Sequence, residues 1–234
     1  MKKIFILIPF FNEEGNILRM VKDLIKTIAQ IDNCKFTVYM IDDCSTDNGK
    51  NLIKSFLNEK NITNVNLIEN NKNMGKSYSL KNAINVIQSD YSILMDGDYQ
   101  DDPKDIVKFI KKTEEGFDLV IGNQIKNISN FKKICVFIFS QIISFFLNIK
   151  NVTTLCPQFL LINTKYIKKI NFKKNDHRYI AIGAIFSGIK YSEISINYFK
   201  REYGVSKFSK FKVFYAFFEV IGLIYRLKKD KFYS

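Results

Sequence analysis

Strand-like apolar segments alternate with helix-like segments through the first 125 residues of the chain. Helices are predicted over 13–29, from a cap at Ser45 or Asp47 to Asn58, over 75–88 and over 103–115, and strands over 3–10, 36–42, 64–69, 91–98 and 117–123. This alternation predicts an α/β fold with a mostly parallel sheet. Ligands of such sheets bind at the carboxyl ends of strands, where the polar loops PFFNEE, DDCSTDNG and DGDYQDD follow the predicted strands.

The charge of the chain is unevenly distributed. The 234 residues carry a net charge of +13 and are 47% apolar, which is enough for one good core. Lys and Arg number 16 against 18 acidic residues in 1–120, and 20 against 5 in 121–234. The second half is therefore expected to face an anionic partner, unless it simply forms a solvated lysine-rich surface.

Two apolar segments, 134–149 and 211–227, are predicted to be helices in this basic half. The first would extend about 24 Å, short of the roughly 30 Å of a bilayer core. The second is rich in aromatic residues and has lysines at both ends. These features favour a helix at an anionic membrane surface, and the alternative is that both helices belong to the core. Nucleic acid is not an expected partner, because no recognition motif is present.

The cellular location is predicted from what the sequence lacks. MKK leads directly into a predicted strand without the pattern of a signal peptide, and no apolar run reaches about 20 residues. The four cysteines are scattered and form no CxxC pair. The expected location is therefore cytoplasmic and peripheral on the inner face of the membrane.

Acidic side chains gather in the segment MDGDYQDDP. Asp96 and Asp98 lie two apart at a strand end, and on an extended chain both would point to the same side, with Gln100 two further on. Such oxygen ligands suit Mg²⁺ or Mn²⁺ holding a diphosphate. A helix cap is the alternative, but it accounts only for the last two acids of the segment, Asp101 and Asp102.

Polar residues also follow the first two predicted strands. Asp42 and Asp43 are candidates to accept hydrogen bonds from a base N–H or a ribose hydroxyl, unless they only form a turn. Asn12 and Glu13 lie in the first strand–helix loop, a position that favours a nucleotide. The three loops together indicate a nucleotide-sugar pocket with a metal.

The ordered motifs IPFFNEEGNI, IDDCSTDNG, NKNMGKSYSLKNAI, ILMDGDYQDDP and FDLVIGN resemble those of family 2 glycosyltransferases of the GT-A fold. Within that family, DGDYQDDP looks most like the polyprenyl- and dolichyl-phosphate sugar transferases. The later stretch IKYSEISINYFKREYGVSKF is similar to a segment of those enzymes that carries an Arg, a Gly, a Ser and a Lys in that order.

The resemblance implies a role for each matching residue. Asp42 and Asp43 would contact the nucleoside, Asp96, Asp98 and Gln100 would surround the metal, and Arg201, Ser206 and Lys207 would bind the acceptor phosphate. Asp98 and Arg201 are expected to be catalytic. The expected nucleotide-sugar site comprises Pro9, Asn12, Glu13, Asp42, Asp43, Lys76 and Asp96.

The chain departs from the family pattern at three positions. Gln124 stands where an Arg is usual, Thr154 where an Asp is expected, and Gln158 where a Gly is expected. These departures bear on the acceptor or sugar pocket. They also leave open a catalytically silent relative that binds nucleotide or lipid as a scaffold.

The expected reaction is a single displacement with inversion, from a nucleotide sugar to polyprenyl phosphate. A phosphomonoester is largely charged at pH 7 and needs no general base. The alternative is transfer to a sugar hydroxyl of a glycan, with Asp176 as base. Residues 1–125 would form the nucleotide-sugar-binding core, 126–210 the acceptor-binding half of the same domain, and 211–234 the membrane-interface helix.

Overall fold

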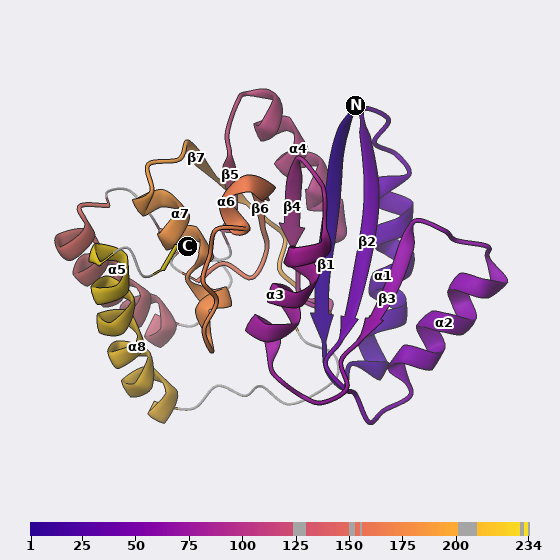
Figure 1. Cartoon of the computed structure of the whole chain (residues 1–234), viewed down its shortest axis with the longest axis horizontal. Coiled ribbons are helices and arrows are strands. Elements are labelled where there is room, and N and C mark those ends of the chain that lie inside the picture. The colour runs from indigo at the N-terminus through magenta and orange to yellow at the C-terminus, as the bar shows by residue number, and fades with distance from the viewer. Residues whose placement is uncertain (124–129, 150–152, 155, 201–209, 230–231, 234) are drawn as a thin grey trace.

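A single mixed sheet runs through the protein. The computed structural model (Figure 1) describes residues 1–123, 130–149, 153–154, 156–200, 210–229 and 232–233. In these residues seven strands pair in the order β3-β2-β1-β4-β6-β5-β7. The strands are β1 (Lys2–Phe10), β2 (Cys34–Asp42), β3 (Val65–Glu69), β4 (Tyr91–Leu94), β5 (Leu119–Asn123), β6 (Leu160–Asn163) and β7 (Tyr191–Ser195). All neighbouring pairs are parallel except those of β6, which is antiparallel to β4 and β5.

Helices cover both faces of the sheet (Figure 1). They are α1 (Glu14–Ile28), α2 (Gly49–Glu59), α3 (Lys76–Val86), α4 (Ile106–Glu114), α5 (Asn130–Leu147), α6 (Thr164–Ile167), α7 (Ile180–Phe186) and α8 (Lys210–Lys228). Side chains alternate along β1, so Ile6 joins the core beneath α1, α2 and α4, whereas Leu7 joins the core beneath α3 and α7. The predicted α/β fold with a mostly parallel sheet is confirmed.

Several predicted elements differ from the observed ones. The fourth strand ends at Leu94, because the chain turns at Gly97 and Asp98 instead of staying extended. The helix expected from Pro103 begins with a short 3₁₀ turn, η1 (Pro103–Asp105), whose cap is Asp102. The second helix starts at Gly49, and Asp47 accepts a hydrogen bond from its first N–H (3.1 Å).

The helices α5 and α8 lie together at the end of the molecule away from β3 (Figure 1). The inner face of α8 joins the core through Val220, Leu223, Ile224 and Leu227. One side of this helix is therefore part of the folded body, and its expected place at a membrane surface stays a prediction. No helix among the described residues has both the length and the apolar character to cross a membrane.

The sheet does not stop where the predicted nucleotide-sugar-binding core ends. Strands β6 and β7, from the segment 126–210, lie in the same sheet as β1 to β5. Strands from both predicted segments therefore contribute to one sheet. The boundaries at 125 and 210 stay predictions.

Candidate active site

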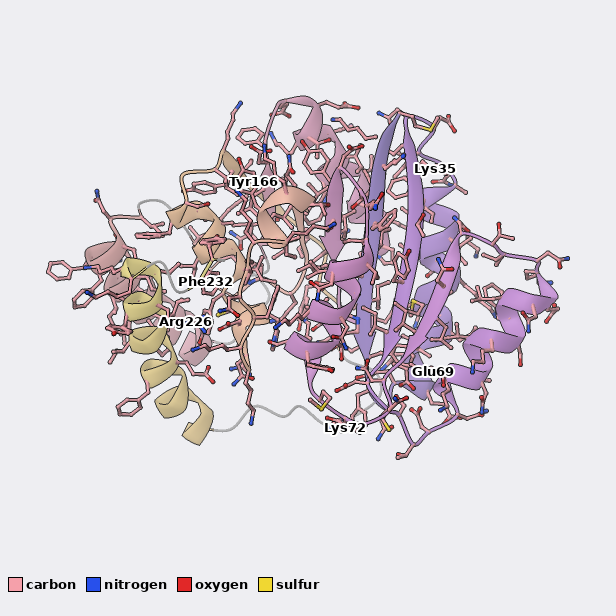
Figure 2. All side chains as sticks on the ribbon, viewed as in Figure 1. Lys35, Glu69, Lys72, Tyr166, Arg226 and Phe232 are labelled. Atoms are coloured by element: carbon pink, nitrogen blue, oxygen red, sulfur yellow. The ribbon has the colours of Figure 1, made fainter. Side chains whose placement is uncertain are left out.

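Three acidic loops meet at one edge of the sheet. They follow β1, β2 and β4, whose parallel pairing brings their carboxyl ends together. Figure 2 shows this edge by the labels of Glu69, the last residue of β3, and Lys72, whereas Lys35 in β2 marks the opposite edge. The three loops thus gather at the sheet edge where the sequence leads us to expect ligands.

The first two loops are joined by reciprocal hydrogen bonds. Asn12, whose φ is 55°, accepts from Thr46 N (2.8 Å) through its side-chain oxygen and donates its backbone N–H to Ser45 Oγ (3.0 Å). The backbone N–H of Glu14 donates to Asp47 Oδ2 (2.8 Å). These bonds fix the loops as one rigid wall.

Two residues predicted for this wall occupy supporting positions. Pro9 is buried in β1 opposite Ile41, so it shapes the loop from within the sheet. Glu13 precedes α1 and accepts a hydrogen bond from Asn16 Nδ2 (2.8 Å). Neither contact reveals a ligand, and their roles in nucleotide binding stay predictions.

Asp42 and Asp43 are both buried, but they differ in their hydrogen bonds. Asp42 Oδ1 accepts from Ser45 N (2.9 Å), whereas Asp42 Oδ2 has no hydrogen-bond partner in the described part of the chain. A buried acceptor without a donor costs free energy, and a ligand N–H or O–H would relieve that cost. Asp42 is fully buried in this structure, and its predicted contact with a nucleoside stays a prediction.

The carboxylate of Asp43 is instead occupied by protein donors. Its Oδ1 accepts from Asn70 Nδ2, Met74 N and Ser79 Oγ, each at 3.0 Å, and its Oδ2 accepts from Gly75 N at 2.8 Å. These contacts hold the loop 70–75 against β2. Asp43 therefore positions the loop 70–75, and the direct nucleoside contact that the sequence suggests for it stays a prediction.

Asp98 lies in the turn after β4 and is nine-tenths buried. Its Oδ1 accepts from Gln100 N (3.2 Å), and the Gln100 side chain donates to Phe199 O (3.3 Å). A pocket of ≈ 250 Å³ opens beside it, and its lining residues are Asn16, Arg19, Asp98, Tyr99, Phe199 and Lys200. Asp98 therefore faces a space that mixes cationic, aromatic and polar groups.

The aromatic side of this pocket is anchored by Tyr99. Its hydroxyl donates to Asp23 Oδ2, and the guanidinium of Arg19 stacks over its ring at 4.7 Å. Burial, together with the Asp23 hydrogen bond, raises the pKa of Tyr99 to about 12, so the phenol stays a neutral donor. These contacts fix the turn that carries Asp96 and Asp98, here called the DxD turn, to α1.

The segment 197–200 runs alongside the DxD loop. Phe199 N donates to Gln100 O (2.7 Å), and Asp102 N donates to Asn197 O (3.4 Å). The residues predicted to bind the acceptor phosphate, Arg201, Ser206 and Lys207, lie outside the described residues, as does Gln124. Their roles stay predictions.

Lys76, the first residue of α3, also contributes its side chain to this edge of the sheet. The ammonium of Lys76 is bonded to Asp96 Oδ1 and to Gln158 Oε1, the latter at 2.9 Å. The structure thus brings together Lys76 and Asp96, two of the predicted site residues. Gln158, one of the departures from the family pattern, completes the group.

Asp176, the candidate base, is engaged elsewhere. Both of its oxygens accept from the Arg226 guanidinium (2.8 and 3.0 Å), and Oδ2 also accepts from Lys173 N (2.6 Å). Burial raises the pKa of this carboxyl, against the opposing effect of those donors. This ion pair ties α8 to the short helix η3 (Asp176–Arg178), and the expected role of Asp176 as a base stays a prediction.

Glu193, which ties loops together at this edge of the sheet, was not singled out from the sequence. Glu193 in β7 accepts from Thr153 N (2.9 Å), Thr154 N (3.2 Å) and Asn123 Nδ2 (3.1 Å). It thereby ties the loop before β6 to the end of β5. The sequence around Glu193 does not indicate this role, because its hydrogen-bond partners lie 39 or more residues away in the chain.

The family described as Glycosyl transferase family 2 matches residues 5–191, which include all three acidic loops. The chain belongs to glycosyl transferase family 2. An uncharacterised protein of Methanocaldococcus jannaschii is 31% identical over 94% of this chain and 98% of its own length. The undecaprenyl-phosphate 4-deoxy-4-formamido-L-arabinose transferase of Proteus mirabilis is 25% identical over 96% of this chain and 66% of its own length.

A solved structure confirms the fold of this family 2 glycosyltransferase. The glucosyl-3-phosphoglycerate synthase of Mycobacterium tuberculosis, in complex with Mn²⁺, UDP-glucose and glycerol 3-phosphate, aligns with a TM-score of 0.65. The alignment covers 99% of this chain and 80% of that one at 12% identity. The GT-A architecture expected from the sequence is therefore shown, and the chain is a glycosyltransferase.

The residues of the DxD turn fit a divalent cation. Carboxylate oxygens are hard donors that suit Mg²⁺ or Mn²⁺, and Asp96 already accepts a cation, the ammonium of Lys76. Among the described residues no three His, Cys, Asp or Glu side chains gather into a metal centre. That Asp96, Asp98 and Gln100 hold the ion stays a prediction, and oxygens of a bound nucleotide sugar would have to complete its coordination.

Proposed function

We propose that this family 2 glycosyltransferase moves a sugar from a nucleotide sugar to the phosphate of a polyprenyl phosphate, on the cytoplasmic side of a membrane. The observation that carries this acceptor is an exposed apolar surface on α5 and α8, here called the aromatic face. Its residues, each about half exposed or more, are Ile134, Phe137, Ile138, Phe145, Phe146, Phe218, Ile221 and Tyr225.

The aromatic face is too apolar for an ordinary soluble surface. The same two helices bury their other sides, for example through Ile143 of α5 and Leu223 of α8, so the exposed side is what remains after the core is complete. Exposed apolar side chains gathered on two helices that pack together favour an interaction site. Short helices that present aromatic side chains and have lysines nearby suit the boundary between lipid headgroups and acyl chains.

Basic residues accompany the aromatic face. Lys228 of α8 lies over the ring of Phe146 in α5, 5.7 Å from its centroid. Residues 121–234 carry 20 Lys and Arg against 5 acidic residues. This charge favours an anionic membrane surface, which also presents the lipid-linked phosphate.

The donor side of the reaction follows from the acidic edge. Asp42 would accept an N–H of the base, the loop 70–75 positioned by Asp43 would shape the nucleoside pocket, and Asp96 and Asp98 would hold the metal. When bound, the metal neutralises charge that develops on the departing diphosphate. Lys200 lines the same pocket as Asp98 and directly precedes Arg201, which supports an acceptor phosphate arriving from that side.

No general base is required for this acceptor. A phosphate monoester with a second pKa near 6 is largely ionised at pH 7, so its oxygen attacks the anomeric carbon directly. A single displacement inverts the configuration at that carbon. The engagement of Asp176 by Arg226 agrees with this mechanism, because transfer to a sugar hydroxyl would need a base in reach of the acceptor.

The decisive experiment measures transfer of labelled sugar into the organic phase. Purified protein is incubated with Mn²⁺ or Mg²⁺, a panel of labelled nucleotide sugars and a short polyprenyl phosphate. Label that enters the organic phase with the wild type and with Asp32→Asn, an exposed control, but not with Asp98→Asn, supports the proposal. Label that appears only on added glycans points to a hydroxyl acceptor, and binding of vesicles without nucleotide binding points to a scaffold.

Membrane binding is tested with a matched pair of variants. Phe145 is 83% exposed on the aromatic face, and Val86 is 69% exposed at the end of α3. Phe145→Ser should weaken co-sedimentation with anionic vesicles while Val86→Ser leaves it unchanged. Binding should fall as salt rises, and equal binding by both variants would argue against the aromatic face as the contact.

A further inference from the structure

Lys76 connects the DxD motif to Gln158. Its ammonium is bonded to Asp96 Oδ1 and donates to Gln158 Oε1 (2.9 Å), and the side chains of Lys76 and Asp96 are about three-quarters buried. Gln158 Nε2 is in turn near Cys156 O (3.4 Å), which orients the amide with its oxygen toward the lysine. One cation therefore links a predicted metal ligand to a neutral acceptor.

We propose that Lys76 is an internal counter-cation that occupies Asp96 until the metal and nucleotide bind, and that Gln158 is a positioning residue that then retains Lys76 beside the diphosphate. This inference rests on the proposed function, since it takes Asp96 and Asp98 as the residues that hold the metal. It assigns a role to Gln158, which stands where the family pattern has a Gly.

The competition follows from charge. A divalent ion and the ammonium of Lys76 are both cations drawn to the carboxylate of Asp96 and repel each other there, so each weakens the binding of the other. The donor diphosphate carries negative charge that a nearby lysine stabilises. Lys76 therefore lowers the affinity for a metal ion that binds without nucleotide. It raises the affinity for the nucleotide.

The backbone beneath Lys76 is fixed, so the exchange involves its side chain. Gly75 has a φ of 85° and donates its N–H to Asp43 Oδ2 (2.8 Å). On the other side, Ser77 Oγ is bonded to His177 Nδ1 (2.9 Å) and accepts from His177 N (3.1 Å). Between these anchors, the flexible four-carbon stem of the lysine can turn from Asp96 toward a ligand.

Gln158 suits the task of holding the lysine. An amide oxygen accepts a hydrogen bond from an ammonium but carries no charge, so it does not compete strongly with a phosphate for it. When Asp96 is taken by the metal, the bond to Gln158 keeps the ammonium at the edge of the site. A glycine at position 158 would remove the bond from Lys76 to Gln158 and leave the bond to Asp96.

The test measures metal and nucleotide binding without any turnover. Binding of Mn²⁺ alone is followed by electron paramagnetic resonance, and Mn²⁺-dependent binding of UDP and of GDP by calorimetry. Lys76→Met should bind Mn²⁺ alone roughly three- to tenfold more tightly and the better nucleotide roughly three- to tenfold more weakly. Gln158→Gly should weaken both, because Lys76 then stays on Asp96.

Matched controls separate this inference from the proposed function. Lys81→Met removes another lysine of α3 and should change neither affinity, and thermal melts establish that each variant is folded. If the wild type binds Mn²⁺ and Asp98→Asn abolishes it, but Lys76→Met binds Mn²⁺ equally or more weakly, the inference alone is overturned. If the wild type binds no Mn²⁺, the metal site and the inference both fail.

Discussion

The guanidinium of Arg226 in α8 donates two hydrogen bonds to the carboxylate of Asp176 in η3, at 2.8 and 3.0 Å. Both side chains are largely buried, and Arg226 also lies 5.0 Å from the centre of the Phe232 ring (Figure 2). Glu219, two turns earlier in α8, accepts from Asn175, Arg178 and Tyr179. The helix that carries part of the aromatic face is thus fastened to the segment next to α3.

Removing Arg226 should destabilise the protein. Arg226→Met leaves a buried carboxylate without its cation, which costs about 3–5 kcal/mol in comparable buried pairs. The cost should shrink as pH falls, since burial already raises the pKa of Asp176 and a protonated carboxyl needs no cation. Urea unfolding at pH 7 and at pH 5 measures both effects. The double variant Asp176→Asn/Arg226→Met should recover much of the loss, and an unrecovered loss would argue against the ion pair as its source.

His177 should make the protein sensitive to acid. Burial, with Lys76 and Arg178 nearby, lowers the pKa of His177 to about 2 from an ordinary 6.5. The unfolded chain takes up a proton below pH 6.5 while the folded chain does not, so this residue's contribution to stability falls as pH falls below 6.5. His177→Asn keeps an acceptor for Ser77 but does not titrate. Its free energy of unfolding should decline less than that of the wild type between pH 7 and pH 5, and parallel declines would contradict the assignment.

The edge of the sheet that carries the site could be predicted because local signals sufficed. Apolar runs such as IFILIP and the polar residues after them give both the strands and the ends at which ligands gather. Strand β6 was missed, because the four residues LLIN gain their place only from pairing with β4 and β5, which lie far away in sequence. Short apolar runs do not reveal such pairing.

The roles of individual acids were harder to predict for the same reason. Asp42 and Asp43 are neighbouring residues of the same type. Asp43, however, accepts hydrogen bonds from donors that lie 27 to 36 residues away in the chain. Asp176 similarly meets a guanidinium 50 residues later in the chain. Spacing in the sequence identifies a carboxylate that could bind a ligand. Whether protein donors already use its oxygens depends on residues that are distant in the sequence.

Asp42, whose Oδ2 has no hydrogen-bond partner among the described residues, should matter for nucleotide affinity. Asp42→Asn places an amide where Oδ2 or Oδ1 accepts, so either the ligand or Ser45 N loses its acceptor. A buried unsatisfied group costs about 1–3 kcal/mol, which corresponds to a loss of roughly 5- to 150-fold in affinity. Calorimetry with UDP and GDP measures this loss, with Asp32→Asn as control. Unchanged affinity for both nucleotides would remove Asp42 from the nucleoside site.

Gly97 should not tolerate replacement even by alanine. A Cβ at Gly97 would lie 2.7 Å from Phe10 Cβ, closer than such atoms approach in folded proteins, and 3.0 Å from Ile17 Cδ1, which is a tight contact. The first of these atoms is attached directly to the backbone of β1 and cannot turn away. Gly97→Ala must therefore shift the turn that carries Asp98, at a cost of about 1–3 kcal/mol for overpacking.

This shift predicts a distinctive pattern of effects for Gly97→Ala. Mn²⁺ binding should weaken together with stability, because the strained turn holds Asp98, whereas a nearby change that spares the turn should affect stability alone. Ile17→Val is such a change, since it removes one methylene from the same contact and costs about 0.5–1.5 kcal/mol. Urea unfolding and Mn²⁺ titration of the two variants distinguish the cases. A Gly97→Ala variant with wild-type stability and metal affinity would show that β1 and the DxD turn can separate freely, against the close packing found here.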